Sequence, residues 1–176
     1  KVSIPASLAR IEEKAFYECN KLKSVTFSEN SNLLSIGKSA FINISIENIK
    51  IPSSVIQIED SAFSNCKNLK TVIFSDNSEL ISIGKSAFES SSVKTVTIPP
   101  NVIQIKEKAF FNCEKLESVT FSDNSELISI GKSVFENTAI ESIFIPSGVV
   151  EIKKETFSDC KNLKSVMLPA NLTKIS

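Results

Sequence analysis

The sequence predicts a right-handed superhelix in which short, similar repeats stack on one another. The segment SDNSELISIGKS occupies residues 75–86 and returns unchanged at residues 122–133, which is 47 residues later. An Ile-Pro pair follows the same interval: Ile4-Pro5, Ile51-Pro52, Ile98-Pro99 and Ile145-Pro146. Each 47-residue unit divides into two similar halves of 24 and 23 residues. Residues 1–176 are therefore expected to form a single domain of about seven repeats, each burying its apolar edge against its neighbours.

The first element of each repeat is expected to be a β-strand. Within residues 93–116, VKTVTIPPNVIQIKEKAFFNCEKL, Val96 and Ile98 alternate with Thr95 and Thr97. This alternation is typical of a strand that buries one face. Pro99 ends the strand because it has no N–H to donate. Stacking one such strand from every repeat predicts a parallel sheet on the concave side.

The remainder of the repeat is expected to form a second strand and a turn. Residues 102–105 alternate in the same way, which predicts a short second strand. The segment Lys106–Phe110 predicts a helical turn on the convex side. In the alternate repeats, the loop after the first strand is two residues longer and the return is one residue shorter.

One phenylalanine per repeat falls in a fixed context, usually after Ala, and predicts a buried spine. A ligand-binding aromatic ladder would need exposed rings, whereas a repeated A-F site favours stacking inside the solenoid. The expected structural spine consists of Phe16, Phe41, Phe63, Phe88, Phe110, Phe135 and Phe157.

The cysteines are expected to be buried free thiols with a packing role. Adjacent strands lie about 4.8 Å apart, so cysteines two repeats apart are separated by roughly 10 Å. A disulfide needs Cα atoms within about 7 Å, and a zinc site needs its sulfurs about 2.3 Å from one metal. Neither condition is met by the four cysteines: Cys19, Cys66, Cys113 and Cys160.

The composition excludes most catalytic and nucleic-acid-binding functions. The 20 Lys+Arg balance the 20 Asp+Glu, so the chain lacks the basic excess of a typical nucleic-acid binder. Histidine is absent, which removes His-activated nucleophiles and His-containing metal sites. The repeated Gly-Lys-Ser lacks the leading glycine of a phosphate-binding loop. No catalytic, cofactor or metal site is predicted, and no segment is expected to insert into a membrane.

The outward-facing residues of the first strands offer the best partner surface. Three outward-facing positions of each strand line up across the repeats as three columns. Two of these columns hold similar residues in every repeat, whereas the residue in the middle column varies from repeat to repeat. Variation against a repeating background is where specificity for a protein ligand can be encoded. Phe144 and Met167 lie in adjacent repeats and form an apolar pair. The partner-binding candidates are Lys50, Ile73, Phe144 and Met167.

The pattern L-x-x-V-x-I-P-x-x-V-x-x-I-x-x-x-A-F-x-x-C-x-x-L resembles the BspA-like class of leucine-rich repeat from Val2 to Ile175. Alternate repeats depart from it, with Ser28, Ser75 and Ser122 in place of Pro. Proteins of this family are mostly surface or secreted proteins of mucosal bacteria and parasitic protists. The resemblance therefore implies a leucine-rich-repeat solenoid that is not an enzyme. It also implies adhesion to, or recognition of, a host-cell or matrix protein at the cell surface.

An intracellular scaffold for protein–protein interaction is the alternative, since unpaired thiols also fit a cytoplasmic location. The chain begins at Lys1 rather than Met, so we expect a fragment of a longer protein. Neither end carries a polar capping repeat, so end-to-end self-association through uncapped repeats is expected. Two glycosylation sequons begin at Asn43 and Asn171 and give only faint support for secretion.

Overall fold

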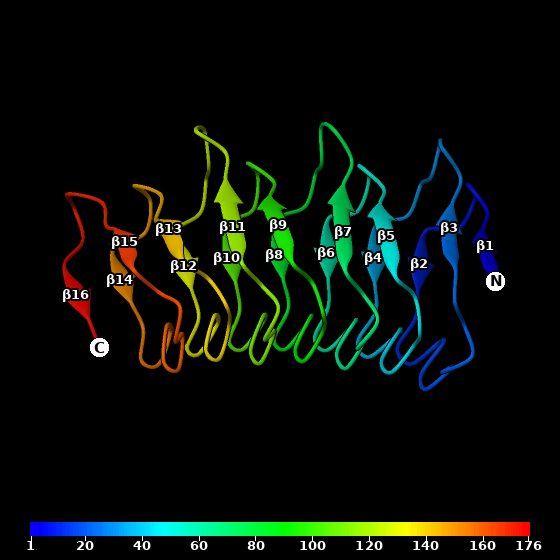
Figure 1. Cartoon of the computed structure of the whole chain (residues 1–176). Coiled ribbons are helices and arrows are strands. Elements are labelled where there is room, and N and C mark those ends of the chain that lie inside the picture. The colour runs from blue at the N-terminus through cyan, green and yellow to red at the C-terminus, as the bar shows by residue number, and fades with distance from the viewer.

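The protein is a β-solenoid of about eight turns, described for residues 1–176 by a computed structural model (Figure 1). Each turn contributes one strand of up to four residues and one strand of two residues, and every paired strand is parallel to its partner. The N- and C-termini lie at opposite ends of the solenoid (Figure 1). Each turn therefore meets only the turns before and after it, which is the arrangement that the repeat period predicts.

The first strand of each turn lies on what we call the long-strand face. Its central sheet has the order β11-β9-β7-β5, and the pairs β1-β3 and β13-β15 flank it. The register follows the sequence repeat, with Asn48 opposite Thr71 and Thr71 opposite Thr95. The strands of this face are β1 (Val2–Ile4), β3 (Val25–Phe27), β5 (Asn48–Ile51), β7 (Thr71–Phe74), β9 (Thr95–Ile98), β11 (Ser118–Phe121), β13 (Ser142–Phe144) and β15 (Ser165–Met167).

The second strand of each turn lies on what we call the short-strand face. Six of these strands form one sheet of order β12-β10-β8-β6-β4-β2, and β14 pairs with β16. The strands are β2 (Arg10–Ile11), β4 (Ser35–Ile36), β6 (Gln57–Ile58), β8 (Ser82–Ile83), β10 (Gln104–Ile105), β12 (Ser129–Ile130), β14 (Glu151–Ile152) and β16 (Lys174–Ile175).

The loops that join the two faces alternate in length. Residues 75–81 connect β7 to β8, whereas residues 99–103 connect β9 to β10. The longer loops rise above their neighbours after β3, β7 and β11 (Figure 1). The loop after β15 would be a long one in this alternation, but Leu168-Pro169 places it with the short Ile-Pro loops.

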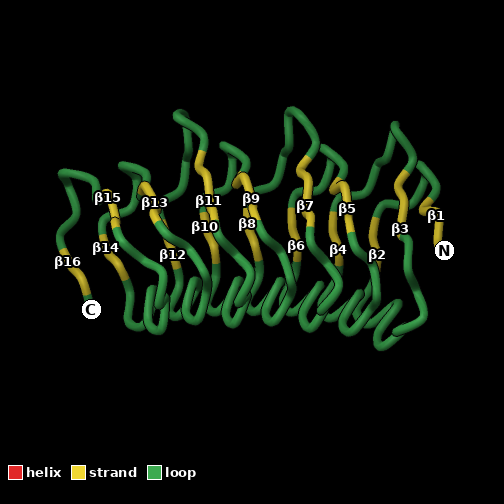
Figure 2. Tube along the Cα trace, in the orientation of Figure 1, coloured by secondary structure: helices red, strands yellow, loops and turns green.

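The predicted helical turns are wrong, because no segment of the structure is a helix (Figure 2). In residues 106–112 the N–H of Ala109 bonds to the carbonyl of Lys106 (3.2 Å), which closes a turn. The N–H of Lys108 instead bonds to the carbonyl of Lys132 in the next turn (2.9 Å). Lys108 and Asn112 have φ of 58° and 60°, outside the right-handed helical region. Hydrogen bonds between turns therefore replace the i→i−4 bonds of a helix.

The core is a continuous stack of the seven spine phenylalanines. Consecutive ring centroids are separated by 5.2 to 6.0 Å, with interplanar angles of 0° to 16°. Phe88 is fully buried and lies between Phe63 and Phe110. Phe16 and Phe157, the two ends of the stack, are half-buried because each has a ring on one side only.

The cysteines differ in burial, so the prediction of four buried thiols is wrong for Cys19, which is exposed. Cys66 and Cys113 are buried, and Cys160 is half-buried. The Cys66 thiol donates to the carbonyl of Phe41 and the Cys113 thiol to that of Phe88, both at 3.1 Å across one turn. Removal from water raises the pKa of Cys66 to about 12 and that of Cys113 to about 11. None of the four forms a disulfide.

No helix in the structure has the length and apolar character that a membrane-spanning helix requires.

Candidate functional site: the long-strand face

The long-strand face presents hydroxyl groups to solvent and hides its aliphatic side chains. In β9, Thr95 and Thr97 are exposed while Val96 and Ile98 are buried. The same alternation recurs in β5 and β11. The repeated inward residues hold the strands in register, which leaves the outward residues free to differ from turn to turn.

The four predicted partner-binding residues are all exposed, but they form two separate pairs. Lys50 lies opposite Ile73, and Phe144 lies opposite Met167. Ile73, Phe144 and Met167 are 50%, 53% and 55% exposed. Three strand spacings separate Ile73 from Phe144, a distance of about 14 Å. The structure therefore provides an apolar pair at one end of the face and a mixed cationic and apolar pair near its middle.

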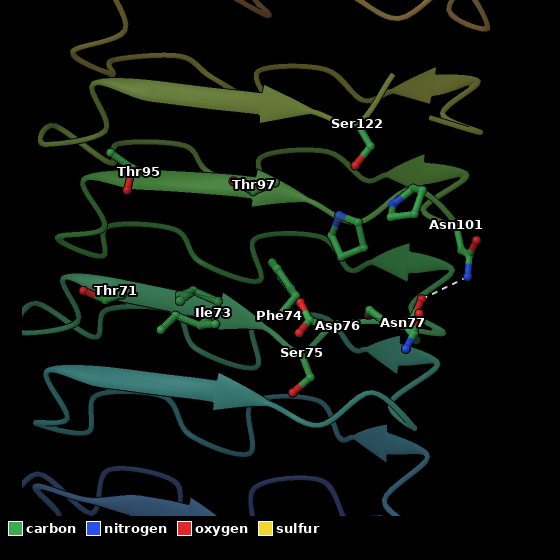
Figure 3. A pocket seen from close by; sticks show the side chains of 14 residues that line it. Thr71, Ile73, Phe74, Ser75, Asp76, Asn77, Thr95, Thr97, Asn101 and Ser122 are labelled. Carbon is green, nitrogen blue, oxygen red and sulfur yellow. Dashed lines mark hydrogen bonds between the residues drawn. The ribbon is translucent and has the colours of Figure 1, made fainter. Parts of the chain in front are cut away.

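A groove of about 810 Å³ lies beside Ile73 on this face (Figure 3). Thr71, Thr95 and Thr97 line its floor, and the long loop after β7 forms one wall. Asn101, on the short loop after β9, donates its amide to the carbonyl of Ser78 at 2.9 Å and ties the two loops together (Figure 3). The lining is mainly hydroxyl, amide and backbone groups, with Val72, Ile73 and Phe74 as its apolar members.

A second groove, of about 820 Å³, lies over β3 and β5 and shares Ile73 with the first. Lys23, Glu47 and Lys50 bring charges of both signs to it. Glu47 accepts a hydrogen bond from Lys70 at 3.0 Å, whereas Lys50 makes no ion pair or side-chain hydrogen bond. Lys23 likewise makes no such contact, so Lys50 and Lys23 are the cations on this groove that are free to meet an anionic group of a partner.

The chemistry of the face suits binding through many weak polar contacts and a few apolar ones. No group of three or more His, Cys, Asp or Glu side chains is arranged to hold a metal ion. At the end of the face, Lys164 donates to Glu141 at 2.8 Å, and this hydrogen bond lowers the pKa of the Glu141 carboxyl.

The asparagines of the two glycosylation sequons, Asn43 and Asn171, are exposed. The amide of Asn171 donates to the carbonyl of Ser147 at 2.7 Å.

Sequence reasoning missed the groove walls. The signal for them is the alternating loop length, because a two-residue insertion in every second turn leaves a lower loop between two taller ones. The segment Ser75–Ser78 and the lower loop Pro99–Asn101 border the same groove. Neither was selected as a candidate, because Asn, Asp and Ser are ordinary turn residues.

Solved structures of three bacterial proteins share this fold. The pneumococcal vaccine antigen PcpA is 24% identical with a TM-score of 0.75, over 92% of this chain and 44% of that one. A leucine-rich cell surface protein from Faecalibacterium prausnitzii is 26% identical with a TM-score of 0.60, over 98% and 55%. A leucine-rich repeat protein from T. pallidum is 22% identical with a TM-score of 0.78, over 94% and 77%. The chain thus spans about half the length of the first two. A comparison with curated proteins gives no match.

The sequence itself matches a family profile along its whole length. The profile of the BspA type leucine-rich repeat region matches residues 1–99 and 81–176, with six copies of the repeat. The structure agrees with this match. Each turn carries two strands that pair in parallel with those of the neighbouring turns, and one Phe ring per turn stacks on the next at the spacing of the repeat. The chain belongs to the BspA-type leucine-rich repeat family.

Proposed function

We propose that the chain is a non-catalytic recognition module that binds a host-cell or matrix protein through its long-strand face and acts in adhesion at a cell surface. The leucine-rich repeat is a protein-interaction fold whose extended face is open along the whole solenoid. The observation that carries the proposal is the exposed pair of Phe144 and Met167 on a face that is otherwise rich in hydroxyl groups.

The pair has the properties of an interface anchor. Residues that dominate binding are commonly large side chains that become fully desolvated at the centre of a contact. Burying the exposed halves of Phe144 and Met167 contributes about 1 kcal/mol each from apolar area alone. Their neighbours Ser142 and Ser165 are exposed and provide polar groups at the rim. Lys50 and Ile73 provide a second, weaker contact further along the face.

The proposed surface location rests on the relative from F. prausnitzii. That protein is described as a leucine-rich cell surface protein and aligns with 98% of this chain at 26% identity. The chain spans 55% of that protein.

The double variant Phe144→Ser/Met167→Ser tests the proposal. Both side chains point away from the core, so the variant should fold while its affinity for cells or matrix proteins falls about tenfold or more. The matched control is Tyr17→Ser, which removes a 43% exposed side chain from a turn outside both strand faces and should leave binding unchanged. Binding of the labelled chain to cultured cells and to immobilised matrix proteins measures the effect. A double variant that binds as well as the parent excludes this face as the binding site.

A further inference from the structure

An exposed aliphatic ridge runs along the edge of the short-strand face. In six consecutive turns the residue just before the short strand is Leu, Ile or Val. Five of these side chains are between 36% and 58% exposed, and Ile103 is half-buried. The backbone keeps them adjacent, since the N–H of Ile81 bonds to the carbonyl of Ile56 and that of Ile103 to Ile81, both at 2.9 Å. The ridge consists of Leu34, Ile56, Ile81, Ile103, Ile128 and Val150 and is about 24 Å long.

The fold does not require aliphatic residues on this ridge. The residue before each ridge position, such as Val102 or Leu127, is fully buried and closes the core. The equivalent outward positions of the long-strand face are filled mainly by Ser and Thr. In the first and last turns the ridge position holds Ala9 and Thr173, so the apolar stretch has two ends. An exposed apolar row of this length marks an interaction surface.

A column of charges lies beside the ridge on the same face. It is formed by the residue that follows each short strand, where the ladder continues with Lys106 N–H bonded to Ile83 O and Gly131 N–H bonded to Ile105 O. The charges are acidic in the first half of the solenoid and basic in the second: Glu12, Glu59, Lys106 and Lys153. Lys153 donates to Ser129 of β12 at 3.4 Å, which places its side chain over the short strands. Glu59 accepts from the N–H of Lys38 at 3.1 Å, and Glu12 lies 3.9 Å from Arg10.

Glycine occupies this column in the turns between the charges. A Cβ on Gly84 would lie 2.5 Å from the backbone carbon of Glu59, and one on Gly131 would lie 2.4 Å from the backbone nitrogen of Glu107. No side chain can therefore stand at these positions. Successive charges are two turns apart, roughly 10 Å, which leaves room for one side chain of a facing molecule between them.

We propose that the short-strand face binds a second copy of this chain, with the two solenoid axes antiparallel. A two-fold axis between β8 and β10, parallel to the strands, places the ridges face to face. Ile81 then meets Ile103 of the partner, Ile56 meets Ile128, and Leu34 meets Val150. Such a contact is isologous, so each pairing occurs twice.

The charges support the antiparallel direction. The same axis places Glu59 of one copy between Lys106 and Lys153 of the partner, and it places Glu12 beside the partner's Lys153. Each of Glu59, Lys106 and Lys153 then lies opposite the open position of a partner's glycine. In a parallel dimer the two-fold axis would run along the solenoid. The charge columns of the two copies would then not lie over each other, and the alternation of acidic and basic side chains across the interface would be lost. Charge complementarity of this kind fixes direction more than it adds affinity.

The dimer is expected to be weak. The ridge alone exposes on the order of a few hundred Å², below the ~800 Å² per partner of a standard interface. The neighbouring Gln57 and Gln104 must contribute as well. The proposal is independent of the adhesion face, because the long strands stay open in the dimer.

Sedimentation of the chain over a concentration series tests the ridge. The parent should show a monomer–dimer equilibrium, and Ile81→Ser/Ile128→Ser should raise the dissociation constant about tenfold or more. The matched control is Ile73→Ser, an equally exposed residue on the long-strand face, which should leave the dimer intact. The proposal fails if the parent is monomeric up to about 1 mM. It also fails if self-association survives the ridge variant, as it would for contacts through the solenoid ends.

Two charge variants test whether the charge columns of the two copies face each other, without touching the ridge. Glu12→Lys/Glu59→Lys makes the column wholly basic, and Lys106→Glu/Lys153→Glu makes it wholly acidic. Each variant alone should dimerise more weakly than the parent, because like charges then face one another. An equimolar mixture should regain the parental dimer as a heterodimer. A mixture that associates no better than its components overturns the antiparallel arrangement, and circular dichroism shows whether each variant is folded.

Discussion

The central turns and the first turn carry the same A-F-x-x-C motif but bury it to different degrees. In the centre, Phe63, Cys66, Phe110 and Cys113 are fully buried. In the first turn, Phe16 is half-buried and Cys19 is exposed. The motif supplies the same atoms in both places, and the difference lies in whether a turn packs on each side. Burial in this solenoid is therefore a property of the neighbours, as expected where stability is a sum of nearest-neighbour terms.

The largest expected effect comes from the phenylalanine stack. Phe88→Ala removes a fully buried ring that contacts rings at 5.4 and 5.3 Å on its two sides, so it should cost about 3–5 kcal/mol in the free energy of unfolding. Phe16→Ala removes a half-buried ring with one neighbour and should cost about half as much. Urea denaturation measures both values. Equal losses at the two positions would contradict the nearest-neighbour account.

A middle-sized effect is expected from the thiols. In the native protein a thiol reagent should modify Cys19 at once, whereas Cys113 should react only as the chain unfolds. Burial raises the pKa of Cys113 from 9.0 to about 11, so the folded state retains a proton that the unfolded state releases. The stabilising contribution is therefore complete below pH 9 and is lost as the pH rises toward 11.

Cys113→Ala is the variant that isolates this pH dependence. It should flatten the decline of unfolding free energy between pH 9 and 11. The other ionisable groups are the same in the parent and in the variant and therefore cancel in the comparison. A parent and a Cys113→Ala variant with identical slopes would show that the thiol is not held protonated by the fold.

The sequence predicts the parts of the fold that follow from the length of the repeat, such as the pairing of strands from neighbouring turns. The division of each 47-residue unit into halves of 24 and 23 residues gives the pairing of β5 with β7 and of β13 with β15, because each half adds one strand spacing. The sequence prediction fails at Lys106–Phe110, where a helical turn is expected and the structure forms successive turns instead. The choice there depends on hydrogen bonds to the next turn, such as Phe110 N–H to Val134 O at 3.1 Å. A local pattern does not contain that interaction.

The candidate site was predictable residue by residue but not as an arrangement. Alternation within each strand identifies Ile73 and Phe144 as outward-facing, and both are about half exposed. The repeat count also gives their separation of three turns. The grooves beside Ile73 are different, because they depend on how far the loop Ser75–Ser78 rises above its neighbours. Loop height follows from backbone conformation, including φ of 56° at Asn77, which the sequence specifies only weakly.

The smallest expected effect concerns the surface ion pairs. Removing a pair near the centre of the solenoid should change the free energy of unfolding no more than removing one near its end. Lys70–Glu47 lies toward the middle of the solenoid and Lys164–Glu141 toward its end, with N–O distances of 3.0 and 2.8 Å. All four side chains are more than half exposed, so water solvates and salt screens both pairs alike. Lys70→Ala and Lys164→Ala should each change the free energy of unfolding by no more than the error of a denaturation experiment. The hydrogen bond from Lys164 lowers the pKa of Glu141, so any contribution of that pair is present at neutral pH and is lost as the pH falls below about 4.5, where the carboxyl takes up a proton. If Lys70→Ala were clearly more destabilising than Lys164→Ala, the surface charges would also depend on neighbouring turns, and the distinction between a neighbour-dependent core and an independent surface would not hold.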